Sequence, residues 1–177
     1  NIDKIFNKQI NSYFNFLWHE NKGIREKDVL KHIPPGMMAD INLFRFSLAV
    51  QNSQVFKDKE GNIDTQLARS IFRLLDIQYF LAGDVIVSAN DSSKDIYIIL
   101  DGKAQVVNLE GEKVIATLQS GAHFGEANIL FDWTRKRTAN VISTQISQIG
   151  ILTAKKTEML IDAFPEFHEN LLKIATL

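Results

Sequence analysis

The middle of the chain consists of short strand-like runs at a regular spacing, and this pattern restricts the fold more than any other feature. Most consecutive runs begin about ten residues apart and are rich in β-branched and aliphatic residues. The runs are Val85–Ser88, Ile96–Leu100, Ala104–Leu109, Lys113–Leu118, Ala139–Ser143 and Gln148–Leu152. Asp101-Gly102 and Glu110-Gly111 predict tight hairpin turns. Closely spaced strands of this kind favour an antiparallel sandwich or jelly roll over a parallel α/β sheet.

Helical patterns precede the strand-like runs. The first extends from Asp3 to Trp18, and the polar segment from His19 to Gly23 is expected to break it. Pro34-Pro35 should end a second helix and open a third, because proline disfavours helix at the residue before it and suits the first helical turn. The apolar faces are Phe6, Ile10, Phe14, Leu17 and Trp18, then Val29, Leu30 and Ile33, then Met38, Ile41 and Leu48.

A polar loop from Phe56 to Asn62 separates these helices from the next one, which Asp64 is expected to cap. Two more helices follow the last strand-like run, and the second of them begins at Pro165. The helix after Asp64 has the apolar residues Leu67, Ile71, Leu74 and Leu75. The two helices after the last run have Met159, Leu160 and Ala163, then Phe167, Leu171 and Ile174.

The order of these elements predicts an α+β fold with two parts. We expect residues 1–55 to form a helical segment and residues 63–177 to form an antiparallel β-roll of the jelly-roll type, with an embedded helical turn and two C-terminal helices. With 177 residues, 45% of them apolar, the chain is long enough for one ordinary domain and a smaller helical part.

The stretch FGEANILFDWTRKRTA, from Phe124 to Ala139, carries the residues best suited to hold a ligand. Gly125 has no Cβ, so the backbone can come close to a bound molecule. A short helical turn is expected directly after Glu126. The N–H groups of Ala127 and Asn128 would then lie at its start, where they can point at a phosphate.

Three side chains complete this candidate site. Glu126 can accept a hydrogen bond from a ribose hydroxyl, Arg137 can pair with two phosphate oxygens, and Thr138 adds a hydroxyl beside them. A single arginine suits one negative charge, and there is no GxxxxGK[ST] motif for a nucleoside triphosphate. A 3′,5′-cyclic nucleotide fits this description. Taken singly, these residues also suit a turn glycine and a solvated charged surface, but their order and spacing favour the ligand site.

FGEANIL followed by RTA resembles the phosphate-binding cassette of cyclic nucleotide-binding domains. The resemblance implies that Glu126 holds the ribose 2′-hydroxyl and that Arg137 pairs with the cyclic phosphate. Gly125 and the amides that follow it would complete the cradle. Asn128 departs from the family, which usually has a small residue there. Thr138 is common in channel members, where it is linked to cGMP preference.

The helices before the roll resemble the C-linker of cyclic nucleotide-gated and hyperpolarisation-activated channels. The similar pieces are the aromatic run Tyr13–Trp18, the segment Glu26–Leu30, and the Ile33-Pro34 turn into Ala39-Asp40-Ile41. In those channels the linker joins the last pore helix to the binding domain and makes much of the tetramer contact. The chain would begin inside the second linker helix, so we expect a fragment, which by itself can be a monomer.

The two resemblances imply a sensor on the cytoplasmic side of a membrane. It would bind cAMP, cGMP or both and gate a pore domain of the same chain, within a homo- or hetero-tetramer, through its C-terminal helix and linker. The alternatives are the sensing module of another membrane transporter, or a regulatory domain of a kinase or transcription factor. A transcription factor would need a helix-turn-helix after the final helix. A channel homologue that has lost ligand binding is disfavoured by the intact Gly125, Glu126 and Arg137.

Composition removes several other classes of protein. The net charge of −1 gives no general attraction to nucleic acid, and the absence of cysteine excludes disulfides and thiolate metal sites. No apolar run reaches the ~20 residues of a membrane span. The pair His123 and Glu126 is a weak signal for a metal or a catalytic site, because no further ligands accompany it. We therefore expect no enzyme, no metal and no cofactor besides the nucleotide ligand.

Overall fold

The computed structural model describes residues 4–21, 32–130 and 136–175. Its helices are α1 Lys4–Asn21, α3 Pro35–Arg45, α4 Ser47–Asn52, the 3-10 helix η1 Gln54–Phe56, α5 Thr65–Leu74, α6 Ala127–Leu130, α7 Ala154–Ala163 and α8 Pro165–Ala175. Its strands are β1 Asp76–Phe80, β2 Val85–Val87, β3 Ile96–Asp101, β4 Lys103–Val107, β5 Val114–Gln119, β6 His123–Phe124, β7 Asn140–Ser143 and β8 Ser147–Leu152. The helix predicted to carry Val29 and Leu30 lies outside these residues.

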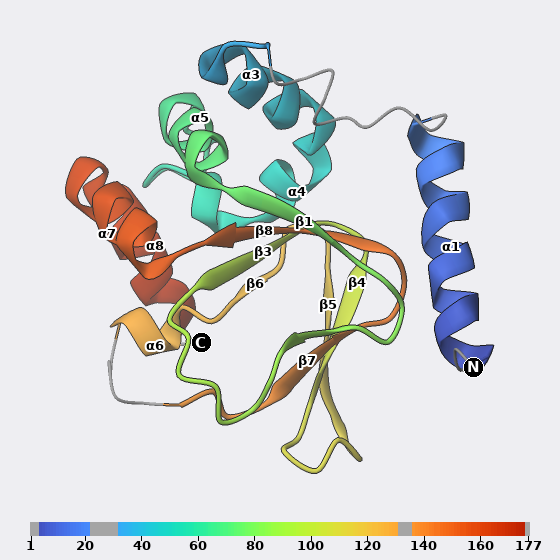
Figure 1. Cartoon of the computed structure of the whole chain (residues 1–177). Helices are drawn as coiled ribbons and strands as arrows, with labels where there is room; N and C mark the ends of the chain where they lie inside the picture. Colours follow the sequence, from blue (N-terminus) through green and yellow to red (C-terminus); the bar gives the residue numbers. More distant parts are fainter. Residues whose placement is uncertain (1–3, 22–31, 131–135, 176–177) are drawn as a thin grey trace.

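The strands form the predicted antiparallel roll. Within the described part of the chain there are two four-stranded sheets, in the orders β1-β8-β3-β6 and β2-β7-β4-β5 (Figure 1). Apolar side chains from both sheets fill the space inside the roll. They are Ile86, Val87, Tyr97, Ile99, Ala104, Val141 and Ile149.

Helices cover the outer face of the sheet β1-β8-β3-β6 (Figure 1). Successive side chains of a strand point to opposite faces, so Ile96, Ile98 and Leu100 of β3 pack under the helices while its alternate residues fill the roll. Phe167 and Leu171 of α8 are fully buried in this helical core. The C-terminal helix therefore belongs to the packed body of the domain, as its apolar spacing predicted.

Three helix starts are confirmed, and one of them is Pro165, the first residue of α8. Pro35 is the first residue of α3, where its missing N–H costs nothing. Asp64 caps α5, because its side-chain oxygen accepts hydrogen bonds from the N–H groups of Gln66 at 2.9 Å and Leu67 at 3.0 Å.

One of the two predicted hairpins is wrong. Asp101-Gly102 does make a tight turn, but it joins β3 of one sheet to β4 of the other, and these strands do not pair. Gly102 has φ +101°, and a Cβ there would lie 2.7 Å from Cα of Ser147. The turn therefore takes the chain from one sheet to the other. Glu110-Gly111 does connect the paired strands β4 and β5, as predicted.

The helical predictions also need correction. The segment predicted to break at His19 stays helical as far as Asn21. Phe14 and Trp18, expected on a packed face of α1, are 62% and 63% exposed. No helix in the described ranges is long and apolar enough to cross a lipid bilayer.

The apolar face predicted after Pro34-Pro35, with Met38, Ile41 and Leu48, is wrong in part, since only Met38 is half-buried. Ile41 and Leu48 are exposed, and the buried residues are instead Ala39, Asn42 and Phe46. Their spacing of three and four residues forms a continuous stripe toward α5. Leu48 lies in the separate helix α4, so it does not share a face with the residues of α3.

Candidate functional site

The candidate site begins where β6 ends. β6 stops at Phe124, Gly125 follows, and α6 starts after Glu126, as the sequence predicted. Gly125 has φ +97°, a conformation that residues with a Cβ rarely adopt. A Cβ on it would lie 2.6 Å from the carbonyl oxygen of Asp95 and 2.7 Å from the Nη1 atom of Arg137. Both the backbone conformation and the space therefore require glycine.

Arg137 lies against this glycine and is only 6% exposed. Its Nη1 donates to the carbonyl oxygen of Gly125 at 2.8 Å, and its Nη2 donates to that of Asp95 at 2.6 Å. Its carbon Cζ lies 5.8 Å from the ring centre of Tyr97. The Nε atom is buried and has no hydrogen-bond partner among the described residues. A buried charged donor without a partner is costly, so this N–H is a strong candidate for a bound anion.

The loop between β2 and β3 fixes the backbone of Arg137. The N–H of Arg137 donates to the carbonyl of Asp91 at 2.8 Å, and its own carbonyl accepts from the N–H of Asn90 at 2.8 Å. Burial lowers the pKa of the guanidinium, while Tyr97, Asp91 and Asp95 nearby oppose that change. An arginine nevertheless stays charged at neutral pH, so a buried positive charge lies at the centre of the site.

Glu126 supplies an acceptor beside this donor. Its carbonyl oxygen accepts the N–H groups of Ile129 and Leu130 at 3.0 and 3.1 Å and so begins α6. The carboxylate atom Oε2 is buried and has no partner within the described residues. Burial raises the pKa of this carboxyl, and the charge of Arg137 partly opposes the rise. The side chain thus has an unused acceptor that a ligand hydroxyl could satisfy.

The structure brings together Gly125, Glu126 and Arg137, which are separated in sequence by up to twelve positions. Ala127 and Asn128 are the first two residues of the four-residue helix α6, and Asn128 is buried. Thr138 directly follows Arg137 and is exposed. The contribution of the last three residues to ligand binding stays a prediction.

Three residues at the site were missed by the sequence reasoning. Asp91, Asp95 and Tyr97 come from β3 and the loop before it, far from the cassette in sequence. No local motif marks them. The only signal available was the position of Tyr97 in a strand-like run, and that does not reveal which strand lies beside it.

His123 lies directly before the cassette, in β6. It pairs with Ile98, whose side chain faces the helices and not the interior of the roll. Both ring nitrogens are buried without a partner among the described residues, and burial lowers the pKa of the imidazole to about 4. The ring is therefore neutral near pH 7. The described residues contain no group of three or more potential metal ligands from His, Cys, Asp and Glu.

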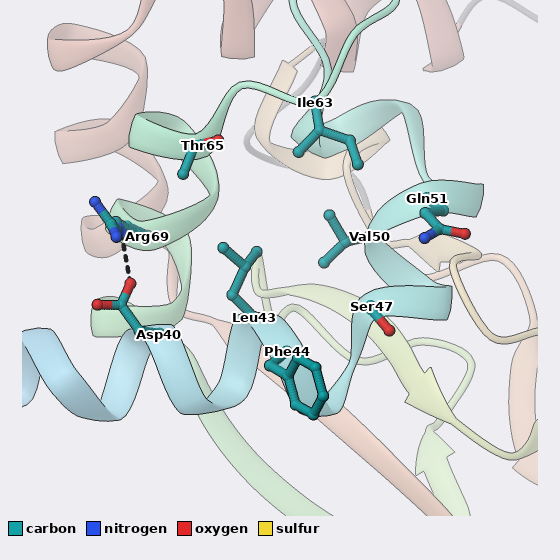
Figure 2. Close-up of a pocket in the computed structure, with 9 residues that line it drawn as sticks. All are labelled: Asp40, Leu43, Phe44, Ser47, Val50, Gln51, Ile63, Thr65 and Arg69. Atoms are coloured by element: carbon teal, nitrogen blue, oxygen red, sulfur yellow. Dashed lines mark hydrogen bonds and ion pairs between the residues drawn. The ribbon is translucent and has the colours of Figure 1, made fainter.

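A groove of about 620 Å³ lies away from the cassette, between α3, α4 and α5 (Figure 2). Its floor is apolar, with Leu43 and Val50, and Phe44 stands at its side. An ion pair between Arg69 and Asp40, at 2.5 Å, spans one end. The groove belongs to the helical part of the chain, and no residue predicted for nucleotide binding lines it.

Comparison with known families identifies the domain that contains these residues. Residues 77–164 match the family described as Cyclic nucleotide-binding domain, and the match includes the whole cassette. The chain carries a cyclic nucleotide-binding domain. Gly125, Glu126 and Arg137 all lie within this domain, the first two between β6 and α6 and the third in the segment before β7.

Similar proteins extend the likeness beyond the binding domain. A "Cyclic nucleotide-gated channel" of Caenorhabditis elegans is 29% identical over 175 residues, which cover 97% of this chain and 23% of that protein. The "Cyclic nucleotide-gated channel rod photoreceptor subunit alpha" of Gallus gallus is 28% identical over 170 residues, covering 94% and 26%. The "Cyclic nucleotide-gated channel beta-3" of Homo sapiens is 28% identical over 180 residues, covering 98% and 21%. The chain thus spans about a quarter of the length of these relatives, and the similarity includes the helices before the cyclic nucleotide-binding domain.

Proposed function

We propose that the chain binds a 3′,5′-cyclic nucleotide, cAMP or cGMP, in the cradle formed by Gly125, Glu126 and Arg137. One observation carries the proposal: a buried donor, Nε of Arg137, and a buried acceptor, Oε2 of Glu126, both lack partners among the described residues. A cyclic nucleotide supplies the matching pair, because its phosphate accepts hydrogen bonds and its ribose 2′-hydroxyl donates one. The amides of Ala127 and Asn128 and the hydroxyl of Thr138 are the proposed further contacts.

The charge at the site suits a phosphodiester. Arg137 brings one positive charge, whereas Glu126 and the nearby Asp91 and Asp95 are acidic. A dianionic monophosphate or a triphosphate would meet too little positive charge there. A cyclic diester carries a single negative charge, so one guanidinium can balance it.

We further propose that binding is passed to the helices before the roll through α8. This helix packs on α6, which Glu126 begins, and also on η1. Asn170 of α8 is buried and donates to the carbonyl oxygen of Lys57 at 2.5 Å, and Glu169 forms an ion pair with Lys59 at 3.1 Å. α8 thus contacts both the cassette and the end of the helical segment. The ligand can shift this helix only by binding one arrangement better than another.

The proposed whole protein is a membrane channel with this chain on its cytoplasmic side. The similarity to cyclic nucleotide-gated channels includes the helical segment, which supports a channel over a kinase or a transcription factor. Phe14 and Trp18 of α1 and Phe44 of α3, which is 85% exposed, offer apolar surface for contacts between subunits of the proposed tetramer.

Calorimetric titration of the wild type and Arg137→Ala with cAMP and with cGMP tests the binding site. Removing the guanidinium should cost about 2–4 kcal/mol, or roughly one to three decades of affinity. Lys136→Ala is the matched control, because Lys136 is the exposed neighbouring cation and should change affinity little. Failure of the wild type to bind either nucleotide, or equal affinity of the wild type and Arg137→Ala, would refute the proposal.

A further inference from the structure

Tyr97 lies close to both residues whose carbonyl groups accept hydrogen bonds from Arg137. β3 and β6 pair with Tyr97 opposite Phe124. Asp95 comes two positions before Tyr97, and its carbonyl accepts a hydrogen bond from Nη2 of Arg137. Gly125 directly follows Phe124, and its carbonyl accepts one from Nη1. The register of this strand pair therefore assembles an aromatic surface and two acceptors around one guanidinium.

The aromatic surface is itself packed against a second ring. The rings of Tyr97 and Phe124 stack with their centres 5.1 Å apart and an angle of 4° between their planes. Tyr97 is 7% exposed and belongs to the core of the roll, and Phe124 is half-buried and packs against that core. Burial raises the pKa of the phenol, so the ring is neutral at pH 7 and acts on Arg137 through its π-face.

Two hydrogen bonds alone would not fix the orientation of Arg137. The bonds at Nη1 and Nη2 define an axis through the guanidinium, about which the plane can still tilt and swing Nε. The ring centre of Tyr97, 5.8 Å from Cζ, lies within the range of a cation–π contact. A third contact outside this axis restricts the tilt.

We propose that Tyr97 is a positioning residue for nucleotide binding: its ring, supported by Phe124, sets the direction in which the Nε–H of Arg137 meets the cyclic phosphate. The inference rests on the proposed function and deepens it, since it assigns a role at the same site to a residue that would not itself touch the ligand. It requires the π-face of residue 97 and not its hydroxyl.

Two substitutions separate the ring from the hydroxyl. Tyr97→Leu removes the π-face and should weaken cAMP and cGMP binding about 3- to 30-fold. Tyr97→Phe keeps the ring, so its affinity for cAMP and cGMP should stay within about twofold of that of the wild type. In the Arg137→Ala background Tyr97→Leu should change affinity no further, because the ring acts only through the guanidinium. A general loss of packing would weaken binding in both backgrounds.

The orientation of Arg137 can also be measured directly by NMR, in the wild type and in Tyr97→Phe. The Nε–H proton resonance of Arg137, assigned by its loss in Arg137→Ala, should carry an upfield ring-current shift in the ligand-free protein and retain it in Tyr97→Phe. An unshifted resonance overturns the inference, and so does equal nucleotide affinity of Tyr97→Leu and the wild type. If the wild type binds neither nucleotide, the proposed function fails, and the resonance still decides whether Tyr97 positions Arg137.

Discussion

Substituting alanine at Gly125 tests whether the cradle depends on close backbone packing around Arg137. The new Cβ would lie 2.6 Å from the carbonyl oxygen of Asp95 and 2.7 Å from Nη1 of Arg137, both well inside van der Waals contact. These two atoms belong to the hydrogen bonds that hold the guanidinium. The methyl group therefore pushes on the anchoring contacts themselves, in addition to straining a backbone with φ +97°.

The expected magnitudes follow from these two effects. An L-residue in a left-handed conformation costs roughly 1–2 kcal/mol, and overpacking a tight site costs about 1–3 kcal/mol more. Gly125→Ala should therefore lower the free energy of unfolding by roughly 2–5 kcal/mol. Because Arg137 must shift to relieve the contact, nucleotide affinity should fall about tenfold or more, but less than in Arg137→Ala.

Gly111→Ala is a matched control, because it isolates the backbone strain. Gly111 has φ +78°, and a Cβ there would meet no atom within 4 Å. The control should lose only the roughly 1–2 kcal/mol of strain and should bind nucleotide like the wild type. Urea unfolding gives the stability of each variant, and calorimetry gives the affinity. If Gly125→Ala lost no more stability than Gly111→Ala and bound nucleotide with wild-type affinity, the close packing around Arg137 would not be needed for stability or binding.

Two further predictions concern titration. The pKa of Glu126 is raised in the folded chain, so its contribution to stability is present in acid and is lost as the pH rises through that pKa. Glu126→Gln should therefore raise the free energy of unfolding at pH 7 and weaken nucleotide binding about 10- to 100-fold. The control Glu112→Gln, at an exposed turn, should change neither quantity. A lower free energy of unfolding for Glu126→Gln than for the wild type would contradict the argument. The pKa of His123 is lowered to about 4, so its contribution is present above about pH 6.5 and is lost as the pH falls toward 4, a loss of roughly 3 kcal/mol. Urea unfolding across this pH range gives the free energy of unfolding as a function of pH. It should fall less steeply toward pH 4 for His123→Gln than for His168→Gln. Equal slopes for the two variants would contradict the role given to His123.

The parts of the site that the sequence predicted are those set by neighbouring residues. Gly125 and Glu126 are adjacent, and the α6 turn follows from the apolar residues after them. The period and spacing of the strand-like runs were also enough to predict an antiparallel roll. Each of these features depends on local backbone preference, which a short window of sequence contains.

The parts that were missed depend on which strands pair. Asp101-Gly102 predicts a turn, but the same dipeptide fits a reversal within one sheet and a passage to the other sheet. Tyr97 reaches Arg137 only because β3 pairs with β6 in one particular register. Register is decided by the packing of both faces of β3, with Tyr97 inside the roll and Ile98 under the helices. That choice involves residues from the whole domain, so no local pattern could reveal it.

The same geometry bears on how binding could reach the helical segment. Arg137 already donates to two backbone carbonyls and contacts the ring of Tyr97, so a phosphate at Nε need not reorganise it. Glu126 is different, because its carbonyl begins α6 and its carboxylate atom Oε2 has no partner among the described residues. A ribose hydroxyl that donates a hydrogen bond to this carboxylate acts on the start of α6. This helix packs on α8, and Asn170 of α8 donates to the carbonyl of Lys57. Under the proposed function, Arg137 therefore binds the phosphate without rearrangement, while Glu126 is the residue through which the ligand can favour one position of α8 over another.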